Sequence, residues 1–183
     1  DGWEVDNDLN PLSDDASGDL DTDNYSNIVE FLHDSDPNDS QSTSQPGTVS
    51  VPSQAGTIQD AIDYSVDGDS IVVAEGTYYE NVEFGNHFVI LTSTDPNDPE
   101  VVAATIIDAN GTGTVVDFSA TQEGDAAIDG FTITGGATGI YCLRLSCPVF
   151  KRTRAVCESF RSAVFAIPAN ISFAFGKSFH TLA

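Results

Sequence analysis

The sequence predicts an all-β fold in which short strands stack in parallel, preceded by a small and mostly irregular module. Three observations support this expectation. Apolar segments of a few residues alternate with Gly, Asn and Asp corners throughout residues 70–142. One short amphipathic segment precedes them, whereas residues 1–44 are rich in Asp, Asn and Ser. Brief strands separated by sharp corners are typical of a solenoid, whose coils each turn tightly and stack on the next.

The pattern changes from helical to extended within residues 57–84. Three apolar residues share one face of a short helix that Thr57 can cap, namely Ile58, Ala61 and Ile62. Asp67-Gly68-Asp69 ends this helix. The apolar run 71–74 is too short for a second helix and predicts a buried strand, and the alternation in residues 78–84 predicts another.

Further strands follow in the same manner. They are expected at residues 87–93, 104–108, 114–118, 127–134 and 138–142. Residues 94–100 are expected to form a loop that leaves the stack. Val73, Ile90 and Ile133 are expected to point into the interior. Together these segments make about three coils, which is near the lower limit for a stable solenoid.

Four stretches carry a resemblance to a known family: TIQDAID, DGDSIVVAEGTYYENVEF, HFVILTSTDPNDPEVVAATIID and AIDGFTITGGATGIYC. They resemble the opening coils of bacterial right-handed parallel β-helix proteins of the pectin-lyase-like class, over roughly residues 54–142. The resemblance implies an N-terminal helix that caps the open end of the solenoid, followed by coils of parallel strands. It implies no single activity, because this fold carries lyases, hydrolases and adhesins.

A twelve-residue stretch of the acidic module has the spacing of a Ca²⁺ loop. Its positions 1, 3, 5, 9 and 12 are Asp19, Asp21, Asp23, Asn27 and Glu30. The carbonyl of Tyr25 stands at position 7. Because Ca²⁺ takes six to eight oxygen ligands, this spacing predicts a site with Glu30 as a bidentate ligand. The stretch resembles EF-hand loops and, more narrowly, dockerin and thrombospondin type 3 modules.

Position 6 of this loop is Asn24, where the EF-hand pattern has Gly because the turn needs a positive φ. Asn is the residue other than Gly that tolerates this conformation best. A helix is expected at residues 27–33, and no second complete loop follows. The sequence therefore predicts a structural site with a Kd of roughly 10⁻⁴ to 10⁻³ M. The alternative is an acidic, disordered linker whose Asp spacing is accidental.

The distribution of charge excludes several partners. Residues 1–142 contain 28 of the 29 acidic residues and no Lys or Arg, and the whole chain has a formal net charge of −23. Such an acidic body would repel nucleic acid and anionic lipid but attract divalent cations. No run is long enough to span a membrane, so membrane insertion is not expected. The lack of Met favours an internal fragment or a processed chain.

The chain divides into four expected parts: a calcium module at 1–39, a linker at 40–53, the coils at 54–142 and an anomalous tail at 143–183. All six basic residues lie in the tail, where the pattern of the coils stops. We interpret the tail as a frame-shifted or otherwise mistaken translation. The alternative is a genuine C-terminal segment whose basic face docks on the acidic body.

Groups suited to catalysis are sparse. Pectate lyases need an Arg or Lys base, and residues 1–142 contain neither. Glycoside hydrolysis needs two carboxylates about 5–9 Å apart. Asp108, Asp117 and Asp129 lie on or beside different expected strands and could face outward together, although such residues are ordinary in solenoid coils. The scattered histidines show no zinc-ligand spacing.

The expected molecule is part of a large secreted or cell-surface protein with a structural or adhesive role. Its solenoid would contact extracellular polysaccharide, and Ca²⁺ would stiffen the preceding module. No catalysis is expected within this chain. The alternative function is that of a polysaccharide lyase or glycoside hydrolase whose catalytic coils lie beyond it. A third interpretation is that this piece does not fold stably alone and has no function in isolation.

Overall fold

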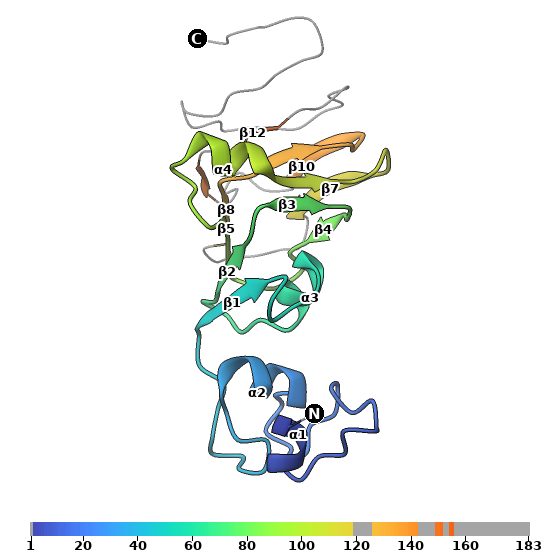
Figure 1. Cartoon of the computed structure of the whole chain (residues 1–183), viewed down its shortest axis with the longest axis vertical. Helices are drawn as coiled ribbons and strands as arrows, with labels where there is room; N and C mark the ends of the chain where they lie inside the picture. The colour runs from blue at the N-terminus through green and yellow to red at the C-terminus, as the bar shows by residue number, and fades with distance from the viewer. Residues whose placement is uncertain (1, 119–125, 143–148, 152–153, 156–183) are drawn as a thin grey trace, which may run out of the picture.

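Most strands of the protein are short and lie in three parallel sheets (Figure 1). The computed structural model describes residues 2–118, 126–142, 149–151 and 154–155. An acidic module lies at the N-terminal end, and the strands stack away from it along the long axis of the molecule (Figure 1). The predominance of parallel strands agrees with the all-β expectation.

The N-terminal module is mostly irregular, as predicted. It contains α1 (Gly2–Asp6) and α2 (Asn27–His33), and α2 coincides with the helix expected at residues 27–33. The rings of Trp3 and Phe31 meet edge to face, with centroids 5.3 Å apart, and so join the two helices. The remainder of the module is held by turns and side-chain hydrogen bonds.

Strand β1 (Thr48–Val51) corrects the expectation of a linker at residues 40–53. β1 pairs in parallel with β2 (Ser70–Val73). The physical reason is the alternation of Val49 and Val51, both buried, with polar residues, which forms one more apolar rung. Four residues are too few to give a strong pattern when a Ser- and Gln-rich segment precedes them.

Helix α3 (Ile58–Asp63) packs against β1, β2 and β4 (Val82–Glu83) and buries the three apolar residues of its predicted stripe. Its N-terminus is capped twice. The Thr57 hydroxyl accepts a hydrogen bond from the Asp60 N–H at 3.0 Å, which confirms the predicted cap. The Glu80 carboxylate accepts from the N–H groups of Ile58 and Gln59 at 3.2 and 2.9 Å.

From β2 onward, the chain visits the three sheets in a fixed order. The first sheet has the order β1-β2-β5-β8-β11, the second β3-β6-β9-β12 and the third β4-β7-β10. All pairs are parallel. The remaining strands are β3 (Gly76–Tyr78), β5 (Ile90–Ser93), β6 (Thr105–Asp108), β7 (Thr114–Phe118), β8 (Ala127–Asp129), β9 (Thr132–Thr134), β10 (Thr138–Cys142), β11 (Val149–Lys151) and β12 (Arg154–Ala155).

Two expected strands are each divided by a corner. Residues 78–84 end β3 and form β4, and residues 127–134 contain β8 and β9. Gly130 lies between β8 and β9 at φ 85°, in contact distance of Ser93 and Pro96, so a Cβ there would clash as well as strain the backbone. Apolar content on both sides of the corner hides this division from periodicity alone.

A helix, α4 (Pro99–Ala104), follows the predicted loop at residues 94–100 and overlaps its end. Sequence reasoning missed it. The local signals are nevertheless present, because Pro99 occupies the first turn and the Asp98 side chain accepts a hydrogen bond from the Glu100 N–H at 2.9 Å. None of its six residues is buried, so it lacks the apolar stripe by which α3 could be predicted.

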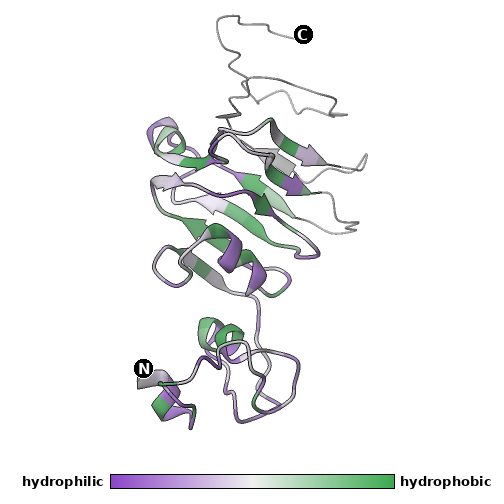
Figure 2. Ribbon diagram, turned by 90° about the vertical axis from the view of Figure 1, so that its right-hand side faces the viewer, coloured by the Kyte–Doolittle hydropathy of each residue, from purple (hydrophilic) through white to green (hydrophobic). Residues whose placement is uncertain are grey.

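The interior is built of apolar rungs in register. Leu91 pairs with Ile71 on one side and with Ile128 on the other, and all three are fully buried. The rings of Phe84 and Phe118 stack with centroids 4.1 Å apart. Hydrophobic residues accordingly recur from strand to strand (Figure 2). Each rung thus covers the apolar surface of the rungs next to it and removes that surface from water.

The orientations expected for three interior residues are confirmed at two positions and wrong at the third. Val73 and Ile133 are fully buried, but Ile90 is 47 % exposed. The correction follows from the pleat, because Val89 and Leu91 face inward and the residue between them must face outward. A segment that is apolar on both faces does not reveal which face is buried.

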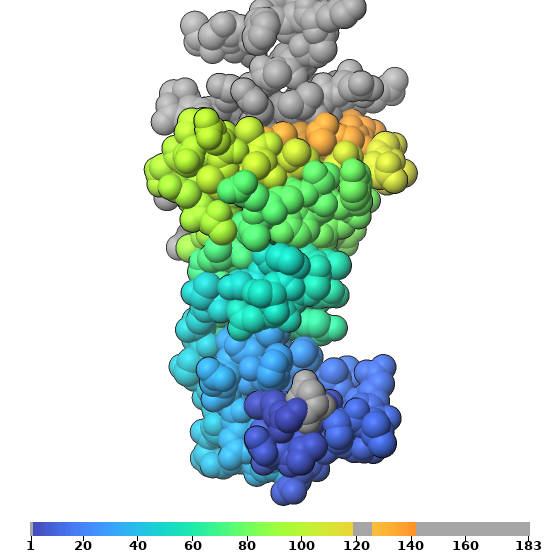
Figure 3. All heavy atoms as spheres, in the orientation of Figure 1, coloured from blue at the N-terminus to red at the C-terminus, as the bar shows by residue number. Residues whose placement is uncertain are grey.

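The module and the coils meet at the C-terminus of α2. The His33 Nε2 lies 2.8 Å from the Asp69 Oδ2, and these side chains are 1 % and 0 % exposed. Asp69 also accepts from the N–H groups of Gly47 at 2.7 Å and Val66 at 2.9 Å. The two parts are in contact on the face that Figure 3 shows.

Two short segments of the expected tail, β11 and β12, extend the first and second sheets. Their backbones continue the parallel register of β8 and β9. The rest of residues 143–183 lies outside the described part, and the interpretation of the tail as a mistaken translation remains a prediction.

Replacement of Leu91 by Ala should lower the free energy of unfolding by about 2–5 kcal/mol, because it leaves a cavity between two rungs. The matched control is Ile90→Ala, one residue earlier on the same strand, which should cost less than about 1 kcal/mol since this side chain is half exposed. Urea unfolding of both variants measures the difference. Equal losses would contradict the inward and outward assignment.

The contact between His33 and Asp69 should make stability depend on pH. The hydrogen bond from Asp69 raises the pKa of His33 above its ordinary value of 6.5. Burial alone would raise the pKa of Asp69, but hydrogen bonds from His33, Gly47 and Val66 outweigh it and lower that pKa. The stabilisation from His33 is therefore complete below about pH 6.5 and is lost as the pH rises through the higher folded-state pKa.

NMR titration of the His33 imidazole should find its midpoint above 6.5, and Asp69→Asn should lower that midpoint. The stability difference between wild type and His33→Ala should be larger at pH 6 than at pH 8.5. A midpoint unchanged by Asp69→Asn would show that the pair does not control this titration.

Candidate metal centre

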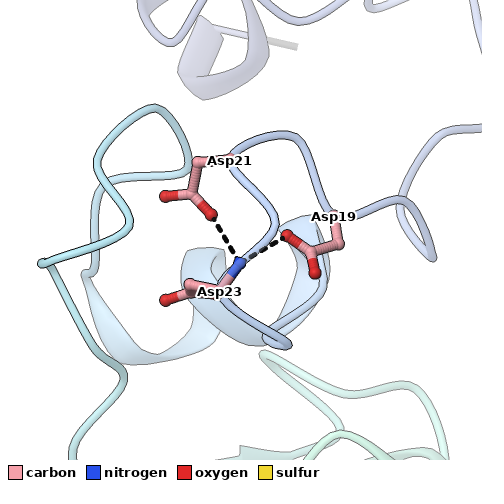
Figure 4. Close-up of side chains that lie close together, drawn as sticks. All are labelled: Asp19, Asp21 and Asp23. Atoms are coloured by element: carbon pink, nitrogen blue, oxygen red, sulfur yellow. Dashed lines mark hydrogen bonds between the residues drawn. The ribbon is translucent and has the colours of Figure 1, made fainter.

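Three aspartates of the N-terminal module form a group that could hold a metal ion. One carboxylate oxygen each from Asp19, Asp21 and Asp23 lies within 4.8 Å of the other two (Figure 4). The three residues occupy alternate positions of one loop, and the Asp19 and Asp21 side chains both accept a hydrogen bond from the Asp23 N–H (Figure 4). These are positions 1, 3 and 5 of the predicted twelve-residue loop.

Backbone N–H groups hold the loop around its first carboxylate. Asp19 Oδ1 accepts from the N–H groups of Thr22 and Asp23 at 2.7 and 3.2 Å, and its Oδ2 accepts from Asn24 N–H at 3.0 Å. Asp23 Oδ1 accepts from Tyr25 N–H at 2.8 Å. Each aspartate therefore folds the chain back on itself, which is the ordinary tendency of Asp in turns.

Asn24 has φ 79°, which confirms the expectation of a positive φ at the sixth position of the loop. Its side-chain Nδ2 donates to the Asp23 carbonyl at 2.8 Å. The short polar side chain of Asn tolerates the left-handed region better than other side chains do. The loop thus completes its turn without the Gly that the EF-hand pattern has at this position.

The first two turns of α2 supply two further oxygens of the predicted set. Asn27 is 4 % exposed and Glu30 is 0 % exposed. The Asn27 Nδ2 donates to the Asp15 carbonyl at 2.8 Å, and the Asn27 N–H donates to the Gly18 carbonyl at 2.7 Å. These bonds fix the amide so that its Oδ1 is turned away from Asp15.

Four buried oxygens at this loop accept no hydrogen bond from the described residues. They are the Oδ2 atoms of Asp21 and Asp23, the Oδ1 of Asn27 and the Oε2 of Glu30. Within the described ranges, only one other buried side-chain atom, the Oγ of Ser93, is in the same condition. Buried oxygens normally have partners, so the four at positions 3, 5, 9 and 12 of this loop are available to a cation.

The electrostatics of the loop favour a cation in the same place. Burial, followed by the charges of Asp21 and Asp23, raises the pKa of Glu30 to about 7. Burial, followed by the charge of Asp23, also raises the pKa of Asp21. Carboxylates that repel one another in a site of low polarity are stabilised when a positive ion joins them.

The structure bears on some of the predicted ligands and not on others. It brings Asp19, Asp21 and Asp23 together, and the free oxygens of Asn27 and Glu30 are consistent with the same set. The role of the Tyr25 carbonyl remains a prediction. Sequence reasoning missed Ser35, whose Oγ donates to Glu30 Oε1 at 3.5 Å and lies 2.9 Å from the Ser44 Oγ. No spacing rule connects a serine five residues beyond the loop to its last ligand.

The other candidate groups are dispersed. Asp108, Asp117 and Asp129 lie on β6, β7 and β8, which belong to three different sheets. The expectation that they face outward together is therefore wrong, because successive strands of one coil form different faces. Among the described residues, His33 contacts Asp69 and His87 contacts Ser65.

Asn24→Val should cost about 1–2 kcal/mol of stability, since a β-branched residue at φ 79° is strained. Asn24→Gly should remain within about 1 kcal/mol of wild type, because Gly adopts this conformation freely. The control is Asn97→Val, at an exposed loop position that is not among the described residues with positive φ. Urea unfolding in the presence of a chelator measures all three. Similar costs for the two Val variants would contradict this account.

Comparison of the chain with protein families, curated proteins and solved structures finds no significant match. No helix in the described ranges has both the length and the apolar character needed to cross a membrane. The fold and the site therefore rest on the residues and contacts of this chain alone. The candidate site is the group of three aspartates that could hold a metal ion, in the loop that precedes α2.

Proposed function

We propose that this protein is a Ca²⁺-binding structural or adhesive protein of the cell surface or extracellular medium. In this proposal, a calcium module precedes the first coils of a right-handed parallel β-helix, and the coils contact polysaccharide. The observation that carries the proposal is the set of buried, unpartnered oxygens at positions 3, 5, 9 and 12 of the loop, counted among the described residues.

Calcium is the cation that suits this donor set best. All the proposed ligand atoms are oxygens, and they come from Asp19, Asp21, Asp23, Tyr25, Asn27 and Glu30. Ca²⁺ takes six to eight oxygens in a flexible arrangement, whereas Mg²⁺ requires a tighter octahedron and keeps several waters. Bound Ca²⁺ would offset part of the negative charge of the carboxylates and hold the loop against α2. The affinity expected of one such loop suits a medium in which Ca²⁺ is millimolar.

The order of the sheets supports a β-helix. Each coil contributes one strand to each sheet, and the next coil repeats this order in parallel. Parallel crossover connections are right-handed in nearly all known proteins, which supports the same hand here. The apolar rungs stack between coils, and α3 covers the end from which the stack begins.

An adhesive role is favoured over catalysis by the surface chemistry. Residues 1–142 contain no Lys or Arg, so a densely anionic polysaccharide would meet like charge. On the first sheet, one row of paired outward positions runs through Ser50, Val72, Thr92 and Asp129, and of these four side chains only Asp129 has acid–base function. We therefore propose a polysaccharide of low charge as the partner. The polysaccharide lyase or glycoside hydrolase remains the alternative for a longer protein.

Calorimetric titration of the full chain with Ca²⁺ should find one site with a Kd of roughly 10⁻⁴ to 10⁻³ M. Glu30→Gln should abolish this site, because the neutral amide removes both the charge and the bidentate ligand. The matched control is Glu100→Gln in the first turn of α4, which should bind as wild type does. Absence of heat with the wild-type chain, or full binding by Glu30→Gln, would refute the calcium site.

Retention on insoluble polysaccharides tests the adhesive role. In the presence of Ca²⁺, the full chain should bind a neutral polysaccharide more strongly than a polyuronate, and it should release no soluble sugar. Assays of the supernatant for reducing sugar ends and for unsaturated sugar ends detect any product that is released. Release of either product would instead support the enzymatic alternative, and equal retention on both polymers would contradict the argument from charge.

A further inference from the structure

We infer that ion binding at the Asp19–Glu30 loop and docking of the N-terminal module on the coils are coupled through α2. This inference rests on the proposed Ca²⁺ site and adds a role to it. The element that couples them is α2, a helix of seven residues that contains Glu30 and ends at His33. A change that fixes Glu30 therefore fixes His33, because both side chains project from the same short rigid element.

The contact at the C-terminal end of α2 is suited to transmit this change. His33 Nε2 meets Asp69 Oδ2 at 2.8 Å, and the His33 ring also contacts the Val29 carbonyl at 2.7 Å through Nδ1. Both nitrogens of the ring are thus engaged, which sets its orientation. Because Asp69 is fully buried, loss of His33 would leave a buried carboxylate with one partner fewer.

A second route joins the same two sites along the chain. Ser35 Oγ donates to Glu30 Oε1 and lies 2.9 Å from the Ser44 Oγ. Three residues after Ser44, the Gly47 N–H donates to Asp69 Oδ1 at 2.7 Å. Glu30 and Asp69 are therefore connected through the helix on one side and through a buried pair of serines on the other.

The energetic basis is the repulsion within the loop. Glu30 lies buried beside Asp21 and Asp23, and nothing among the described residues donates to its Oε2. This arrangement favours displacement of α2 from the loop. An ion removes the repulsion and holds α2 in the position from which His33 reaches Asp69. The coupling must then be reciprocal, so docking raises the affinity for the ion by the same factor.

Amide hydrogen exchange of the full chain, with and without Ca²⁺, tests the inference. Gly47 and Val66 are the reporters, because both N–H groups donate to Asp69 and neither residue is part of the loop. In wild type, saturating Ca²⁺ should slow their exchange about 5-fold or more. Glu30→Gln should abolish the effect. His33→Ala should still bind Ca²⁺, about 5-fold or more weakly, and should lose the effect at both reporters.

The matched control is His87→Ala, which removes a histidine that contacts Ser65 within the coils and should keep both the effect and the affinity. Calorimetry on the same samples separates the possible failures. Binding without any change at Gly47 and Val66 would overturn the coupling and leave the calcium site standing. No binding at all would overturn both. The wild-type comparison needs no substitution, so the inference can be tested even if His33→Ala does not fold.

Discussion

The structure depends on stacking of apolar rungs in the register of parallel strands. Among the described residues, no strand is longer than five residues, so none of them could bury enough surface alone. Leu91 illustrates the arrangement, since its neighbours above and below are both aliphatic and fully buried. The corners, the cap helix and the excursion that ends in α4 are all compatible with this constraint, because each leaves the inward positions aligned.

The acidic module contains little apolar material, and polar contacts hold it together. Its order comes from aspartates that bind nearby N–H groups and from two buried polar residues on α2. Such a network is stable only when its charges are compensated. The module therefore depends on Asp69 of the coils and, in our proposal, also on a cation at the loop.

Local chemistry accounts for what the sequence could predict. The helix 27–33, the cap at Thr57 and the positive φ of Asn24 each follow from residues within one or two turns. The proximity of Asp19, Asp21 and Asp23 follows from their spacing for the same reason. Segments with weak periodicity were missed, as with β1 and α4, and so was the outward orientation of Ile90.

Contacts between distant segments leave no signal in a single sequence. Asp69 was expected only to end a helix, yet it joins Gly47, Val66 and His33. Likewise, the dispersal of Asp108, Asp117 and Asp129 depends on how many strands one coil contains. The corners that divide residues 78–84 and 127–134 fix that number, and these two corners became visible only in three dimensions.

Two glutamines at the starting end of the stack have a consequence for assembly. Ser50 N–H donates to the Gln54 side chain at 2.9 Å, and Glu83 exchanges two hydrogen bonds with the Gln59 amide at 2.8 and 3.0 Å. These amides replace a neighbouring strand on β1 and β4. Another polypeptide could add a strand to β1 or β4 only after it had displaced these amides. On these two sheets, elongation of the solenoid is thereby directed towards the opposite end.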